Sequence, residues 1–332
     1  MLECLHITTR ADVAAARQQA RAEAVQAGLS PTRAEDIAIV ATELTTNILK
    51  YAGTGCFLAQ VMPQPMGVSL ALIAFDDGPG IDDLDRMRQD RISEGDSAGI
   101  GIGAIERLSD RAEIVTGPTG TVWACRFDTA DVTRPHGLDI AGLRLSHPTE
   151  TVCGDVWGTT EHRGGVRLVL ADGMGHGDSA AEAGQAMVDG ALHRPMHPPK
   201  QRLLQIADDL KRTRGGVMSL LDLQPGALRV DYGNLGNISA FYLRRGDQKR
   251  LATRDGYIGS PAARPMEERI DLEPGDTFVL HSDGLRTVGP EDTRPLFGQS
   301  ALMTAALLMA NRDLYRRDDI SVAVAHWVRS DD

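Results

Sequence analysis

The stretch AIVATELTTNILKYA, residues 38–52, carries a carboxylate at Glu43 and an amide at Asn47 within one helical pattern. Ser30–Pro31 supplies an N-cap and a first helical residue, and apolar residues then recur at three- to four-residue spacing through this stretch. Because residues four apart share one face of a helix, the two polar side chains are expected to project from the same side.

The Glu43–Asn47 pair has two interpretations. The amide oxygen of Asn47 can coordinate a Mg²⁺ that bridges phosphates, since Mg²⁺ prefers hard oxygen ligands and takes few of them from protein. Glu43 can then accept the proton of an attacking hydroxyl. The alternative is a solvated polar face with no chemical role, so the pair needs support from other motifs.

Two glycine-rich segments provide that support. Asp76–Gly80 (DDGPG) follows the predicted buried strand Val68–Phe75, and its glycines permit positive φ and close approach of backbone to ligand. Asp76 can accept a hydrogen bond from the exocyclic amine of adenine. Gly99–Gly103 (GIGIG) leads into the predicted helix Ile100–Leu108, whose first amides can bind phosphate. Each segment alone is ordinary turn chemistry or weak evidence, but the three motifs in this order predict an ATP site.

These motifs resemble the N, G1 and G2 boxes of the GHKL ATPase/kinase superfamily, through residues 38–52, 75–81 (FDDGPGI) and 99–111 (GIGIGAIERLSDR). They look more narrowly like the small serine kinases of the RsbT type, and the resemblance covers nearly all of residues 1–128. It implies a GHKL (Bergerat) α/β sandwich that binds ATP and Mg²⁺, with Glu43 as catalytic base and residues 82–98 as a lid. The implied nucleotide contacts are Asn47, which also binds Mg²⁺, and Asp76, Gly78, Gly80, Gly99, Gly101 and Gly103.

A change of sequence texture indicates a second domain. The chain has 332 residues, enough for about two domains. Residues 129–137 (TADVTRPHG) lack apolar periodicity and contain Pro and Gly, so we expect a linker there, between domains at 1–128 and 138–332. Downstream of the linker, many short predicted strands with few helices indicate an α+β layered fold. Among these predicted strands are Gly142–His147, Thr151–Thr160, Val166–Ala171 and Ile320–Val328.

Four acidic motifs mark predicted strand ends in the second domain: CGD at 153–155, ADGMGHG at 171–177, SDGL at 282–285 and DDIS at 318–321. Strand ends on a sheet can bring carboxylates together. Divalent ions on such oxygens would neutralise a phosphate and activate a water for in-line attack. Any single Asp-Gly pair is common turn chemistry, but all four motifs together favour a metal site.

These motifs resemble the PPM-type metal-dependent serine/threonine phosphatases, in their SpoIIE-like and RsbX-like bacterial branch, from about residue 142 to residue 328. The resemblance implies an α-β-β-α sandwich with two Mn²⁺ or Mg²⁺ ions, and disfavours Asp319 as a ligand. Met174 stands where eukaryotic relatives place a histidine, and His176 stays open as a catalytic group or a polar loop residue. The implied metal ligands are Asp155, Asp172, Asp283, Asp318 and the carbonyl of Gly173.

The two resemblances together imply a bifunctional enzyme that phosphorylates and dephosphorylates Ser or Thr on a STAS-domain protein, in bacterial stress or sigma-factor signalling. Two alternatives stay open. The first is an anti-sigma factor of the RsbW type, with a sigma factor as partner, fused to a phosphatase. The second is a phosphatase gated by ATP binding. A homodimer of the kinase domain is a further open point.

Composition limits the classes of partner that we expect and indicates the expected location in the cell. The formal net charge is −11, which argues against nucleic acid or an anionic membrane as the main partner. The four cysteines contain no CxxC pair, so we expect reduced thiols rather than a zinc site or disulfides. No basic and apolar leader and no bilayer-length apolar run are apparent, so the expected location is cytoplasmic.

Overall fold

The structure is a computed structural model that describes residues 4–81, 84, 101–147, 149–162, 164–193, 197–211, 213–316 and 318–328. The chain divides into two compact units. The N-terminal unit holds residues 4–62 and 67–132, and the C-terminal unit holds residues 63–66 and the chain from residue 133 on.

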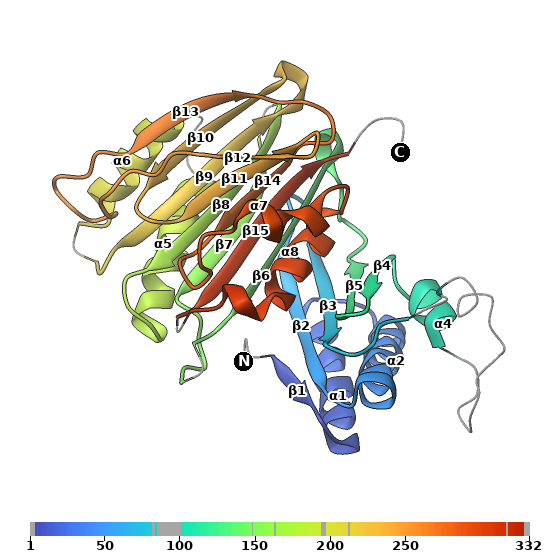
Figure 1. Ribbon diagram of the computed structural model, residues 1–332. Coiled ribbons are helices and arrows are strands. Elements are labelled where there is room, and N and C mark those ends of the chain that lie inside the picture. The colour runs from blue at the N-terminus through green and yellow to red at the C-terminus, as the bar shows by residue number, and fades with distance from the viewer. Residues whose placement is uncertain are drawn as a thin grey trace. The chain divides into compact units, whose positions relative to one another are not determined.

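The N-terminal unit is a layer of helices on one face of a five-stranded sheet of order β1-β2-β3-β5-β4 (Figure 1). Its strands are β1 Leu5–Ile7, β2 Gly55–Pro63, β3 Val68–Asp76, β4 Arg111–Gly117 and β5 Gly120–Asp128. Its helices are α1 Arg10–Gln26, α2 Pro31–Asn47 and α4 Gly101–Leu108. Alternate apolar residues of the strands face these helices and form the core.

Local sequence explains where the first two helices begin. Thr9 and Asp12 form a reciprocal capping box at the start of α1, and the Ser30 hydroxyl accepts a hydrogen bond from the Arg33 amide at the start of α2. Pro31 occupies the first helical position of α2, where its missing N–H costs nothing. The buried face of α1 is made of alanines, which let α1 and α2 pack closely.

The predicted helix does not stay α-helical to its end. After Asn47 the chain continues as one π-helical stretch, Ile48–Ala52, which ends at Gly53 with φ of 77°. The Gly53 amide donates to the Ile48 carbonyl at 2.9 Å, five residues back. Turns of this kind are frequent at functional sites because they re-aim the side chains beside them.

The C-terminal unit is a sandwich of two five-stranded sheets with helices on both outer faces (Figure 1). The first sheet, in the order β13-β10-β9-β8-β7, contains β13 Met266–Asp271, β10 Arg229–Leu235, β9 Gly216–Gln224, β8 Gly165–Gly173 and β7 Asp155–His162. The second, in the order β12-β11-β14-β15-β6, contains β12 Asp247–Arg250, β11 Ser239–Arg244, β14 Thr277–His281, β15 Ile320–Trp327 and β6 Leu138–Leu145. The outer helices are α5 Asp178–Leu192 and α6 Pro199–Asp209 on the first sheet, and α8 Ala301–Ala310 on the second, with α7 Pro290–Thr293 beside β12.

The central strands are packed on both faces, and their sequences are almost continuously apolar. β15 is ISVAVAHW, with its first six residues buried, and β8 is GVRLVLADG, with all but one residue buried. Such near-continuous apolar runs are expected where both faces of a strand are packed. In the described part of the chain, no helix is both long enough and apolar enough to cross a bilayer.

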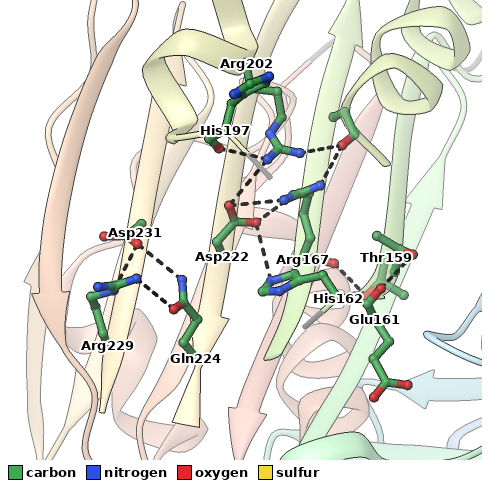
Figure 2. A network of polar contacts seen from close by, with 12 residues as sticks. Thr159, Glu161, His162, Arg167, His197, Arg202, Asp222, Gln224, Arg229 and Asp231 are labelled. Atoms are coloured by element: carbon green, nitrogen blue, oxygen red, sulfur yellow. Dashed lines mark hydrogen bonds and ion pairs between the residues drawn. The ribbon is translucent and has the colours of Figure 1, made fainter. Parts of the chain in front are cut away.

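A buried polar network joins the helices α5 and α6 to the first sheet (Figure 2). Asp222 on β9 accepts a hydrogen bond from Arg167 on β8 at 2.6 Å, and Arg202 of α6 lies 4.0 Å from the same carboxylate. Both arginines also donate to the carbonyl of Ala191 near the end of α5, at 2.9 and 3.1 Å. His162 lies 3.8 Å from Asp222 on the other side. One carboxylate therefore organises three cationic or titratable side chains.

Several boundaries differ from the sequence-based expectation. The first strand of the C-terminal unit begins at Leu138, not Gly142, and the next begins at Asp155, not Thr151. The second shift has a clear cause, since the Gly154 amide donates to the carboxylate of Asp319 at 2.7 Å instead of joining a strand ladder.

Candidate active sites

Glu43 and Asn47 lie one turn apart at the end of α2, and both are partly exposed. Burial raises the pKa of Glu43, and no charged group in the described chain offsets that shift. A carboxyl group whose pKa is raised toward neutrality holds a proton more strongly, as a proton acceptor in phosphoryl transfer must. Asn47 is the last α-helical residue before the π-helical stretch.

The glycine loop after β3 lies against this helix end. Asp76 closes β3, and its Oδ1 accepts a hydrogen bond from the Gly78 amide at 2.9 Å. Burial raises the pKa of Asp76, and the Gly78 amide opposes that rise. A Cβ atom at Gly78 would lie 2.7 Å from Ala52, and one at Gly80, where φ is 77°, would lie 2.2 Å from the carbonyl of Gly117. Only glycine permits this close approach.

The second glycine segment is described in part. Gly101 and Gly103 lie in the first turn of α4, and a Cβ atom at Gly101 would meet nothing within 4 Å. The first N–H groups of a helix have no partner within the helix, which is why a helix start is suited to binding phosphate. Gly99 lies outside the described residues, and so does almost all of the predicted lid at 82–98.

The C-terminal unit gathers the four predicted aspartates from its two sheets. Asp155 and Asp172 are directly paired across β7 and β8, while Asp283 follows β14 and Asp318 precedes the adjacent strand β15. Burial raises the pKa of Asp172, and the charges of Asp155, Asp283 and Asp318 raise it further. Burial and Asp318 likewise raise the pKa of Asp283. Four carboxylates that disfavour one another's charge call for a cation.

Asp155 is the clearest sign that this cation is a metal ion. Its residue is 1% exposed, and both carboxylate oxygens are buried without a hydrogen-bond partner in the described chain. Burial raises its pKa, although the hydroxyls of Ser282 and Ser321 lie near enough to reduce the shift. Among the described residues no three His, Cys, Asp or Glu side chains surround one point in ligating geometry. The oxygen donor set of these carboxylates fits Mg²⁺ or Mn²⁺.

Asp318 and Asp319 differ in what their carboxylates already bind. The two oxygens of Asp319 each accept a backbone amide at 2.7 Å, one from His147 and one from Gly154. This fixes the segment that leads into Asp155. Within the described residues, Asp318 accepts only the amide of its neighbour, at 2.9 Å. Of the adjacent pair, Asp318 is the better candidate ligand, and its role stays a prediction.

His176 forms an exposed pair beside the metal-site loop. Its Nδ1 lies 2.6 Å from Oε1 of Glu150, and its ring stacks on His147 with centroids 6.0 Å apart. The side chain is 64% exposed. The sequence motif pointed to His176, but nothing in the sequence connects it with Glu150, which lies 26 residues earlier. The structure thus shows what holds His176 without assigning it a chemical role.

Two further neighbours of the carboxylates were missed by sequence reasoning. The Asn237 amide donates to Oδ2 of Asp283 at 2.7 Å, and the Arg144 guanidinium donates to the backbone carbonyl of Asp155 at 2.7 Å. Neither belongs to a recognisable motif, so no sequence signal could have found them. An open groove of about 450 Å³ is lined by Arg144, Val152, Cys153, Val156, Asp178, Ala181, Glu182 and Gln185.

Comparison with known families matches both units. The family model described as Stage II sporulation protein E (SpoIIE) matches residues 162–327, half of the chain. The model described as a histidine kinase-like ATPase domain matches residues 8–126.

Two curated relatives from Bacillus subtilis (strain 168) divide the chain in the same way. Serine/threonine-protein kinase RsbT is 34% identical over 107 residues, which cover 32% of this chain and 80% of RsbT. Phosphoserine phosphatase RsbX is 22% identical over 143 residues, which cover 43% of this chain and 72% of RsbX.

Solved structures match the C-terminal unit. RsbX in complex with magnesium superposes with a TM-score of 0.50 and 21% identity, over 57% of this chain and 94% of that one. A structure from work on the bacterial stressosome superposes with a TM-score of 0.50 and 22% identity, over 57% of this chain and 98% of that one. These two neighbours show the phosphatase fold alone.

The matches confirm the predicted fold class, the combination of a kinase-type unit with a phosphatase-type unit, and ATP as a cofactor. The chain belongs to the SpoIIE family through residues 162–327, and through its N-terminal unit to the histidine kinase-like ATPases of the RsbT serine/threonine kinase type.

Proposed function

We propose that this chain is a two-way switch that adds a phosphoryl group to a Ser or Thr of a STAS-domain protein and removes it again. The support is the similarity of one unit to RsbT and of the other to RsbX, together with a structural neighbour from work on the bacterial stressosome. The observation that carries the proposal is the presence of both sites on one chain.

In the kinase half, Glu43 would accept the proton of the acceptor hydroxyl as that oxygen attacks the γ-phosphate of ATP, the bond from the γ-phosphorus to the β–γ bridging oxygen breaks and ADP leaves. Asn47 would hold Mg²⁺ from the same helix face, and Asp76 would select adenine by accepting from its amine. The amides at the start of α4 bind the phosphates. This division of labour rests on positioning and electrostatics, which is how most phosphoryl-transfer enzymes act.

In the phosphatase half, the residues that would hold divalent metal ions are Asp155, Asp172, Asp283 and Asp318, with the Gly173 carbonyl. Ions bound there would neutralise charge on the phosphate and make a water more acidic. Asp319 holds the loop before Asp155 through two backbone amides, and Asn237 orients Asp283. The chain's own residues thus fix the carboxylates from both sheets.

The phosphatase half is tested with a phosphorylated STAS-domain protein, the purified full-length chain and Mn²⁺. Asp172→Ala is expected to lower the rate of phosphate release by at least about 10²-fold, because it removes a metal ligand. Asp178→Ala, an exposed acidic residue six positions later, is the matched control and should keep the rate. Full activity of Asp172→Ala, or of the wild type in excess chelator, would show that the metal site is wrongly assigned.

A further inference from the structure

Arg33 of α2 reaches across to the far end of α4. Its Nη1 donates to the carbonyl of Leu108, the last residue of α4, at 2.6 Å. Its Nη2 pairs with Oδ1 of Asp110 at 2.6 Å. The Arg33 side chain is 24% exposed, so water competes less with these contacts than at an open surface.

Asp110 is itself fastened to the sheet. Its Oδ2 accepts the amide of Asp128 at 2.8 Å, and its own amide donates to the carbonyl of Arg126 at 3.1 Å. The guanidinium of Arg33 also lies over the ring of Phe127, 5.2 Å from its centre. Arg33 therefore contacts a carboxylate, a helix-end carbonyl and an aromatic face, a combination that suits the planar guanidinium and not an ammonium group.

This clamp matters because α4, as far as the structure describes it, has eight residues. A helix of two turns is not stable alone, so tertiary contacts set its position. A cation at its last carbonyl also agrees with the helix dipole. The residues that depend on this position are the glycines at the start of α4, while Glu43 and Asn47 lie further along the helix that carries Arg33.

We propose that Arg33 is a positioning residue that sets the phosphate-binding start of α4 relative to Glu43 and Asn47. The proposal rests on the kinase function proposed above and assigns that function's geometry to one side chain. The adenine end and the phosphate end of the nucleotide should then depend differently on Arg33. Adenine recognition by Asp76 does not involve α4, so only ligands with phosphates should depend on Arg33.

The test is a calorimetric titration of the full-length chain with MgATP and with adenosine. Arg33→Met is expected to weaken ATP binding on the order of tenfold, the size of one lost charge-assisted hydrogen bond, and to leave adenosine affinity within about twofold. Arg33→Lys should recover part of the ATP affinity, because one of the two acceptors can still be reached. The matched control is Arg21→Met, which removes an exposed ion pair with Glu35 between α1 and α2 and should change neither affinity.

The outcomes are distinguishable. Equal weakening of both ligands by Arg33→Met, or unchanged ATP affinity, would overturn the positioning role while leaving the kinase function intact. A wild type that binds no ATP would overturn both. If Arg33→Met does not fold, Asp110→Asn gives the same comparison, since it removes the ion pair and keeps an oxygen for the Asp128 amide; an ATP-selective loss supports the proposal and a non-selective one contradicts it.

Discussion

Asp155 is a candidate metal ligand whose buried carboxylate lowers the stability of the fold. A fully buried carboxylate without hydrogen bonds is among the least favourable groups in a fold, and here three more carboxylates lie close enough to add repulsion. The direction of the pKa shift of Asp155 determines how this residue changes stability with pH. Its folded pKa is raised above the unfolded value, so stability is lost as pH rises from the unfolded pKa through the folded one.

We expect the metal-stripped wild type to become more stable as pH falls from 8 toward 5, because this range lies below the raised pKa of Asp172, about 9, and crosses that of Asp155, about 7. Asp155→Asn should stabilise the stripped chain at pH 7.5 by roughly 1–3 kcal/mol, because it removes one buried charge. Mn²⁺ should raise the melting temperature of the wild type and not of this variant. Calorimetric melting measures both effects, with Asp178→Asn as the control.

A stripped wild type whose melting temperature is flat or falls on acidification would contradict this account of the carboxylate cluster.

Single residues also show what cannot be predicted from sequence alone. Asp318 and Asp319 are adjacent and chemically identical, so spacing alone cannot separate them. Their hydrogen-bond partners differ, since the His147 and Gly154 amides occupy the oxygens of Asp319.

At the scale of elements, the Asp222 network fastens the two outer helices to their sheet (Figure 2). Arg167 and Arg202 are 1% and 0% exposed, and the carboxylate between them is their shared counter-charge. Burial lowers the pKa of Arg202 to about 10, and Arg167 adds to that effect. The network carries more positive than negative charge, so the loss of Asp222 leaves two uncompensated cations.

Asp222→Ala is therefore expected to destabilise the chain by about 3–5 kcal/mol, as measured by urea unfolding followed by circular dichroism. Glu291→Ala, which removes an exposed pair with Arg294, is the control and should cost less than about 1 kcal/mol. A cost at Asp222 no larger than at Glu291 would mean that the network does not hold the helices.

The elements also show what sequence could and could not predict. Long periodic segments such as α2, and apolar runs such as β8 and β15, were predicted because burial imposes their pattern. β12 (DQKR) and β13 (MEERID) are edge strands with mostly exposed residues, so they lack that signal. The π-helical stretch was missed because helical periodicity does not reveal one extra residue in a turn. Contacts such as Asn237 with Asp283 depend on tertiary structure alone.

At the scale of the whole molecule, two opposing reactions on one substrate would cancel unless their rates differ. The two sites depend on different groups, so single substitutions should separate them. In the proposed function, Glu43 serves the kinase and Asp155 serves the phosphatase. Family membership establishes the two types of unit, whereas the shared STAS-domain substrate is the central claim that experiment must decide.

The most direct measurement gives the full-length chain γ-labelled ATP, Mg²⁺ and a STAS-domain protein encoded beside it. With Asp155→Asn, label is expected to accumulate on Ser or Thr of the partner. The wild type should show little net label but steady release of labelled phosphate, and Glu43→Gln should show neither. No label with folded Asp155→Asn, or equal label with Glu43→Gln, would contradict the two-way switch.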